Sequence, residues 1–179
     1  MIYGDRVRLR SVEKEDIPLF FEWLNDPEVI EGLSLFLPMS LADENHWFER
    51  LAERPPEEKP LAIEVRSSDG WRLVGNSGFH NIEWHNRSAE IGIFIGDKSI
   101  WNKGYGTEAV SLLLQHGFGT LNLNRVFLSV HETNRRAIRA YEKAGFIQEG
   151  AMRQAVYKNG KFQDMLFMSV LRSEWESRK

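Results

Sequence analysis

A loop with two glycines and a lysine comes directly before a helix-like run of the sequence, from Trp101 to Ala109. Gly104 and Gly106 allow a ligand to approach the backbone closely. The first amides of the following helix are unpaired and carry partial positive charge, and Lys103 adds a mobile cation. The pattern predicts that an anion such as a phosphate binds here. The alternative is a strand-to-helix turn that merely needs glycine.

The same loop matches the G-x-G-x-x-G/A fingerprint of dinucleotide-binding folds, through Gly104, Gly106 and Ala109. Glu132, at the end of the next predicted strand, lies about where a ribose-binding carboxylate could sit. Residues 97–103 nevertheless separate the preceding strand from the first glycine, whereas the fingerprint turns directly off its strand. The middle of the chain also reads as hairpins, and a single β-α-β step follows the loop. Dinucleotide binding is therefore the weaker alternative.

Asn134 and Tyr141 form a second candidate pair. They are seven positions apart, which is two helical turns, so both side chains face the same way. Asn134 lies at the helix start, from which its side chain can reach a ligand, and Gly145 ends the helix. Tyr141 could instead be a core residue beside Ala137 and Ala144. A buried tyrosine, however, needs a partner for its hydroxyl group.

The composition of the 179 residues excludes several kinds of chemistry. A net charge of −3 gives no basic field for nucleic acid. The absence of cysteine excludes disulfides, thiolate metal sites and a thiol nucleophile. No two of the five histidines have zinc-ligand spacing, so no metal is expected. No apolar run approaches a membrane span, and the charged N-terminus is not a signal peptide. We expect a cytoplasmic protein that does not contact membranes.

Periodicity and turn signals predict a mixed α+β fold of six or seven strands and about four helices. Asp69-Gly70 and Asn159-Gly160 each predict a tight hairpin. Ser40 is the predicted cap of the second helix, with Asp43 three positions later. We expect one domain over residues 1–179. The predicted strands are 5–12, 61–67, 71–82, 88–96, 125–130, 146–157 and 163–171, and the predicted helices are 13–26, 41–51, 106–121 and 133–145.

These motifs together resemble the Gcn5-related N-acetyltransferase (GNAT) superfamily. "GYGTEA" is followed about thirty residues later by "N-x-x-A-I-x-x-Y-E-K-A-G-F". "RVRLRSVEKEDI" and "VYKNGKFQDMLFMSVLRSEW" resemble the branch of ribosomal-protein N-terminal and spermidine acetyltransferases. The resemblance implies the acyl-CoA N-acyltransferase-like fold, a mostly antiparallel sheet with splayed middle strands. One departure is Trp101, which stands where the superfamily usually has Gln or Arg.

The resemblance implies that the phosphates belong to acetyl-CoA. The pyrophosphate would rest on the amides of Lys103 to Thr107, and the pantetheine arm would pair with the backbone of Ile93 and Ile95. Asn134 would hydrogen-bond the arm. Basic residues of the next helix would be available for the 3′-phosphate: Arg135, Arg136, Arg139 and Lys143. The expected cofactor-binding residues are Ile93, Ile95, Trp101, Asn102, Lys103, Gly104, Tyr105, Gly106, Thr107, Asn134, Ala137 and Lys143.

Acetyl transfer to an amine needs a neutral amine, a stabilised oxyanion and a proton for the departing thiolate. Without cysteine, direct attack in a ternary complex is the economical route. The family uses a tyrosine at the position of Tyr141 as the acid. A strand amide near Ile93 would stabilise the oxyanion, and Glu90 is the candidate base. A water chain, or an amine that arrives neutral, is the alternative to Glu90.

The acceptor is a peptide N-terminus, a polyamine or another small amine, and the sequence does not choose among them. Its site is expected from residues 25–40 and the Asn159-Gly160 hairpin, where Asp26, Glu28 and Glu31 could attract a cation or simply be solvated. A homodimer is compatible with the resemblance. The alternative to an enzyme is a catalytically weak regulatory module that binds acetyl-CoA without turnover. Retention of both Asn134 and Tyr141 argues against that alternative.

Overall fold

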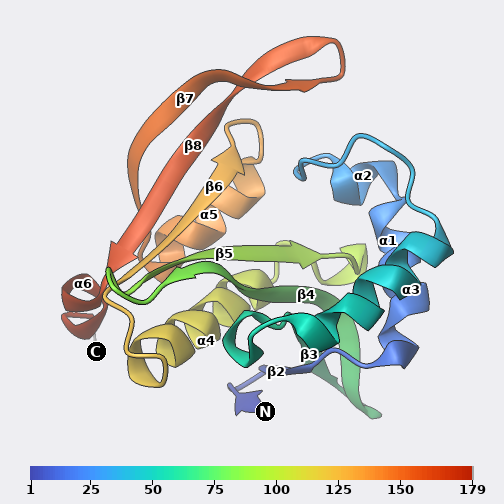
Figure 1. Ribbon diagram of the computed structural model, residues 1–179, viewed down its shortest axis with the longest axis horizontal. Coiled ribbons are helices and arrows are strands. Elements are labelled where there is room, and N and C mark those ends of the chain that lie inside the picture. Colours follow the sequence, from blue (N-terminus) through green and yellow to red (C-terminus); the bar gives the residue numbers. More distant parts are fainter. Residues whose placement is uncertain (179) are drawn as a thin grey trace.

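A computed structural model describes residues 1–178, and its centre is one eight-stranded sheet in the order β1-β2-β3-β4-β5-β6-β8-β7. Within these residues the β5–β6 pair is parallel and the other six strand pairs are antiparallel. Figure 1 shows the sheet crossed by helices, with the β7–β8 hairpin arching away from the body. The strands are β1 Ile2–Tyr3, β2 Val7–Ser11, β3 Leu61–Ser67, β4 Gly70–Glu83, β5 Ser88–Ile95, β6 Arg125–His131, β7 Ile147–Lys158 and β8 Lys161–Leu171.

Six α-helices accompany the sheet over the described chain: α1 Ile17–Leu24, α2 Pro27–Ile30, α3 Leu41–Arg50, α4 Tyr105–Gly119, α5 Arg135–Ala144 and α6 Arg172–Glu176. Four 3₁₀ turns are η1 Lys14–Asp16, η2 Leu51–Glu53, η3 Pro56–Glu58 and η4 Lys98–Ile100. The α+β class and the mostly antiparallel sheet are confirmed. The predicted counts were low because β1, α2 and α6 have two, four and five residues. Segments that short carry no detectable hydrophobic period.

The two faces of the sheet bury two separate apolar clusters, because neighbouring side chains of a strand point to opposite faces. Ile63 and Val74 belong to the larger cluster, which includes the buried side of α4 and the inner residues of α5. Their neighbours Ala62 and Leu73 belong to the smaller cluster, with Phe20 of α1 and residues of α3. The helices α4 and α5 therefore cover one face, and α1 and α3 cover the other.

Local signals correctly predicted the start of α3 and the two hairpins, β3–β4 and β7–β8. The first helix was predicted from residue 13, but residues 14–16 form the 3₁₀ turn η1 and α1 begins at Ile17. The Ser40 hydroxyl accepts from the Asp43 amide, and the Asp43 carboxylate accepts from the Ser40 amide, so the capping box is complete. Asn159 and Gly160 have φ of 52° and 78°, as a two-residue hairpin with the twist of its strands requires. None of the helices in the described chain is long and apolar enough to cross a membrane.

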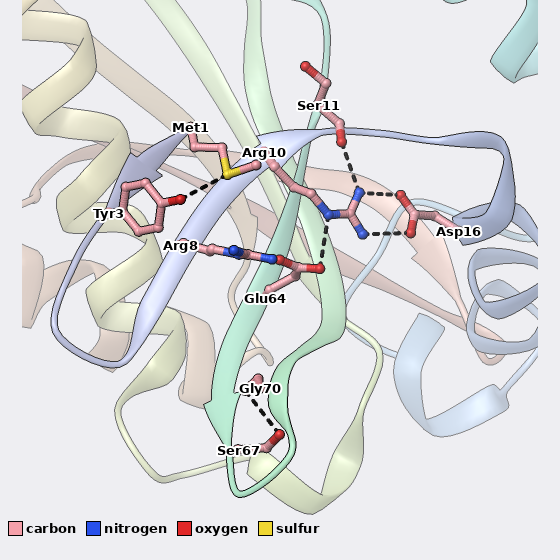
Figure 2. A network of polar contacts seen from close by, with 9 residues as sticks. All are labelled: Met1, Tyr3, Arg8, Arg10, Ser11, Asp16, Glu64, Ser67 and Gly70. Atoms are coloured by element: carbon pink, nitrogen blue, oxygen red, sulfur yellow. Dashed lines mark hydrogen bonds and ion pairs between the residues drawn. The ribbon is translucent and has the colours of Figure 1, made fainter.

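A chain of ion pairs fastens α1 to the sheet (Figure 2). The Glu64 carboxylate on β3 accepts from Arg8 and Arg10 on β2. Arg10 also donates two hydrogen bonds of 2.7 and 2.8 Å to Asp16, which lies directly before α1. Glu64 and Asp16 are 6% and 5% exposed, so water hardly reaches either carboxylate. The Asp16 carboxylate raises the pKa of Arg10, which therefore stays charged.

The parallel pair β5–β6 is joined over three residues and then opens. Pairing runs from Ser88↔Arg125 to Glu90↔Phe127 and stops there. Beyond that point β6 continues to pair with β8, and β5 continues to pair with β4. The Gly96 amide donates to Val74 on β4. Because backbone groups alternate in direction along a strand, the amides of Ile93 and Ile95 face the opening instead.

Candidate active site

A cavity of about 350 Å³ lies where β5 has left β6, between the start of α4, the inner side of α5 and the residues after α2. Twelve of the fourteen residues expected at the site line this cavity: Ile93, Ile95, Trp101, Asn102, Gly104, Tyr105, Gly106, Thr107, Asn134, Ala137, Tyr141 and Lys143. Lys103 and Glu90 do not line it. The structure therefore brings together two motifs that are about thirty residues apart in the chain.

The glycine loop forms an open helix terminus. Gly104 has φ 86° and ψ −4°, a left-handed conformation that favours glycine, and α4 begins at the next residue. No side chain caps α4, and its first intrahelical bond runs from the Glu108 amide to the Gly104 carbonyl. The amides of Tyr105, Gly106 and Thr107 thus lack intrahelical partners and meet at the cavity wall. This arrangement suits an anion.

Gly106 has no side chain and therefore leaves space next to the unpaired amides of the loop. Its φ is not positive, whereas Gly104 has the left-handed conformation that favours glycine. A Cβ on Gly106 would meet just Ile95 Cγ1, at 3.9 Å, among the described atoms. The space beside Gly106 Cα is therefore free of protein atoms and is part of the cavity.

Gly106→Val is expected to weaken acetyl-CoA binding by about tenfold or more, because the branched side chain fills the space over the unpaired amides. The fold should tolerate valine, which is a better helix former than glycine. Calorimetry measures the affinity, and a melting curve checks the fold. The matched control is Gly119→Val in the same helix, where a Cβ meets nothing within 4 Å. Equal acetyl-CoA affinity in the two variants would show that the phosphate lies elsewhere.

Lys103 contributes to the loop through its backbone. Its carbonyl accepts from the guanidinium of Arg6, which is itself paired with Glu108 on α4. The Lys103 side chain is exposed and points to no described partner. Its role as a cation for the phosphate stays a prediction.

The side of α5 that faces the cavity is cationic. Arg136, Arg139 and Lys143 line the cavity, and none of them is within ion-pair distance of a carboxylate of the described residues. The Arg136 guanidinium lies over the Trp101 ring, 3.4 Å from its centroid. Burial lowers the pKa of Arg136. A partly desolvated cation without a carboxylate partner favours an anionic ligand.

Trp101 is held in place by its indole, whose Nε1 donates to the Ile95 carbonyl at 3.0 Å. Trp101, which departs from the superfamily pattern, therefore packs its ring against the Arg136 guanidinium. Arg136 and Arg139 belong to the basic cluster that the sequence had offered for a phosphate, but the set of expected cofactor-binding residues had included Lys143 alone from that cluster. The signal was present in their spacing: positions i, i+3 and i+7 share one face of a helix.

Tyr141 is a buried cavity residue, with 8% of its surface exposed. Its ring packs on Phe146 at 5.8 Å between centroids. Burial raises the pKa of its phenol to about 12. The hydroxyl makes no hydrogen bond to any residue of the described chain, although a buried phenol ordinarily finds a partner. Tyr141 is thus a protonated donor at neutral pH, adjoining the cavity.

Asn134 has partners of its own within the fold. Its side chain accepts from the Ala137 amide at 3.2 Å, which caps α5, and donates to the Gly32 carbonyl at 3.5 Å. A Cβ on Gly32 would lie 2.1 Å from Asn134 Nδ2, so this contact requires glycine. Asn134 therefore joins α5 to the segment after α2. Its predicted hydrogen bond to the ligand stays a prediction.

Glu90 lies on the same face of β5 as Phe94, one position away from the buried Ile91. Its Oε2 accepts from Asn81 at 3.1 Å and lies 3.7 Å from His80 Nε2. The carboxylate is partly exposed but is not part of the cavity wall. The role of Glu90 as the base stays a prediction.

Further wall residues were not singled out from the sequence: Val29, Gly32, Leu33, Phe94, Ile100, Val110 and Ala140. Three of them belong to the segment that was expected to form the acceptor side as a whole. The others are apolar residues that the sequence cannot distinguish from ordinary core. The described residues hold no cluster of three or more His, Asp or Glu side chains placed to bind a metal ion.

Comparison with known proteins agrees with this geometry. The family model for the acetyltransferase (GNAT) domain matches residues 6–147. An uncharacterized N-acetyltransferase, p20 of Bacillus licheniformis, is 30% identical over 97% of each chain. Spermidine N(1)-acetyltransferase of Vibrio cholerae is 27% identical over 98% of each chain. The chain belongs to the GNAT acetyltransferase family.

A solved structure shows the same fold. Spermidine N-acetyltransferase from Vibrio cholerae, crystallised with CoA and spermine, has a TM-score of 0.85 over 97% of this chain and 99% of its own, at 24% identity. The expected class of enzyme, an N-acetyltransferase that uses acetyl-CoA, is confirmed. The uncapped α4 amides, the unpaired α5 cations and the cavity between them fit that cosubstrate.

Proposed function

We propose that this chain, acting as one domain, transfers the acetyl group of acetyl-CoA to a primary amine by direct attack in a ternary complex. The observation that carries the proposal is the cavity in which the unpaired α4 amides, the α5 cations and the protonated Tyr141 meet. The amides of Tyr105 to Thr107 and the cations of α5 would hold the phosphates. The thioester supplies an activated acetyl group.

Groups of this chain can stabilise the negative charge on the thioester oxygen and supply the proton that the departing thiolate needs. The Ile93 amide faces the opening of the sheet, where it can donate to a developing oxyanion. The Tyr141 hydroxyl donates its proton to the departing sulfur. The attacking neutral amine loses one proton to water or to Glu90, and water returns one proton to the Tyr141 phenolate, so the phenol is restored for the next turnover. Charge is therefore balanced without a covalent intermediate on the enzyme.

The acceptor that the site supports best carries a single amine charge. Among the described residues, no Asp or Glu lines the cavity. The acids of the adjoining segment, Asp26, Glu28 and Glu31, do not line the cavity, and Asp26 and Glu28 share Lys98 as their ion-pair partner. A polyamine with several positive charges would gain little from these carboxylates. A peptide N-terminus or a small monoamine fits better. A homodimeric assembly stays a prediction.

The test measures thiol release from acetyl-CoA against an alkyl monoamine, a short peptide with a free N-terminus, and spermidine. We expect turnover with the monoamine or the peptide to exceed turnover with spermidine. Faster turnover of spermidine would overturn the acceptor assignment and leave acetyl transfer intact. Binding of acetyl-CoA without turnover on any amine would favour the regulatory module instead.

A further inference from the structure

One wall of the cavity is formed by a short segment with little secondary structure of its own. Val29, Gly32 and Leu33 supply this wall. They belong to α2, which has four residues, and to the turn that follows it. A single helical turn is not stable by its own hydrogen bonds. The position of this wall must therefore be fixed by contacts from elsewhere.

Two of those contacts come from the tip of the β7–β8 hairpin, which Figure 1 shows projecting from the body on the side of α2. The Lys158 ammonium donates to the carbonyls of Ile30 and Leu33, the latter at 2.7 Å. The neighbouring Asn159 donates to both carboxylate oxygens of Glu31, at 3.2 and 3.1 Å. Two consecutive hairpin residues thus contact three residues of the Ile30–Leu33 segment, of which Leu33 lines the cavity.

Lys158 makes the stronger of these two connections. It is half-buried, and burial lowers its pKa, with Glu31 opposing the change. Its ammonium has therefore exchanged water for protein carbonyls, including that of Ile30 at the carboxyl end of α2. Hydrogen bonds from a charged donor are stronger than neutral ones, and a cation is favoured at that end of a helix.

A second connection, from β6, reaches the same segment. His131 Nε2 lies 3.1 Å from the Ser34 hydroxyl. His131 is 2% exposed, and its Nδ1 has no partner in the described chain. Burial and the nearby Lys158 lower the pKa of His131, so the ring is neutral at pH 7. Lys98 pairs with the side chains of Asp26 and Glu28 at the start of α2. Lys158 is the charged side chain that contacts the backbone at the end of α2 and in the turn after it.

We infer that Lys158 is a positioning residue of the acceptor site: it fixes the Ile30–Leu33 wall against which the amine is held. The inference rests on the proposed function. It also divides the site in two. The phosphate end depends on α4 and α5, whereas the acceptor end depends on the hairpin tip in addition to the contact of Gly32 with Asn134.

The experiment compares Lys158→Met with Lys161→Met and Lys158→Arg. Lys161 lies across the hairpin from Lys158, is exposed, and makes no side-chain contact in the described chain, so its variant removes the same charge and nothing else. Three quantities are measured: hydrogen exchange of the amides of residues 28–37, acetyl-CoA affinity by calorimetry, and KM and kcat with the best amine of the panel above.

Lys158→Met is expected to speed exchange in residues 28–37 and to raise the KM for the amine by about tenfold, since a charged hydrogen-bond donor is lost. Its acetyl-CoA affinity should match wild type. Lys158→Arg, which retains a charged donor, should recover part of the loss, and Lys161→Met should behave as wild type.

Three results would overturn the inference, and the first two are unchanged exchange in Lys158→Met and faster exchange with an unchanged KM. An equal loss of acetyl-CoA affinity would also count against it, because it would indicate general damage. If wild-type enzyme turns over no amine, the proposed function fails separately, and the exchange comparison alone decides whether Lys158 holds the wall.

Discussion

Tyr141→Phe is expected to lower the single-turnover rate of acetyl transfer by ~10²–10⁴-fold, the range typical of general acid catalysis. The ring, its packing on Phe146 and most of the acetyl-CoA affinity should remain. The phenol is the one group removed, and it is buried at the cavity without a protein partner in the described chain. The measurement is a rapid-mixing assay with enzyme in excess. Tyr157→Phe, at the exposed end of β7, is the matched control.

A structural tyrosine would give the opposite pattern. Loss of one hydrogen bond would cost ~1 kcal/mol of unfolding free energy and leave turnover nearly intact. The pH dependence gives a further check. Burial raises the pKa of Tyr141 to about 12, so the protonated donor persists as the pH rises through 10. A wild-type rate that falls with an apparent pKa near 10 would contradict this assignment if the same fall is absent in Tyr141→Phe, because the phenol would then lose its proton near pH 10.

Arg10→Met is expected to lower the free energy of unfolding by about 3 kcal/mol, at the lower end of the cost of breaking a buried ion pair. The variant leaves the Asp16 carboxylate buried without its guanidinium partner, while Glu64 keeps Arg8. Denaturant unfolding followed by fluorescence measures the change. The control is Arg66→Met, since Arg66 is exposed on β3 and its side chain makes no ion pair in the described chain.

A loss below about 1 kcal/mol, the value of an exposed pair, would show that water screens this network despite its burial. The control matters because Arg66→Met also changes the net charge by one. Equal effects of the two substitutions would assign the loss to net charge and not to the Asp16 carboxylate.

The sequence predicted those parts of the fold that depend on local signals. Asn159-Gly160 specifies its hairpin because the two residues accept positive φ, and Ser40 with Asp43 specifies a helix start through side-chain hydrogen bonds. The strand β1 and the helix α2 were not predicted from the sequence. Their formation depends on tertiary partners, such as the pairing of Ile2 with Leu9, and not on any pattern within them.

The site shows the same division. The glycine loop and Tyr141 could be predicted because each belongs to a compact motif with a fixed spacing. The contact of Gly32 with Asn134 could not, because it joins residues 102 positions apart. The partners of Glu90 were missed for a related reason: its contacts with His80 and Asn81 cross from β5 to β4, and strand periodicity gives a face but no partner.

The opening between β5 and β6 has a consequence for how tolerant the site is to mutation. Under the proposed function, the arm of the cosubstrate takes the place of a missing strand and is read by main-chain amides such as those of Ile93 and Ile95. Every amino acid except proline carries that donor. Side chains along this edge can therefore diverge widely while the cosubstrate is still recognised. Part of the binding specificity depends on the path of the backbone, and a comparison of amino-acid sequences does not detect it.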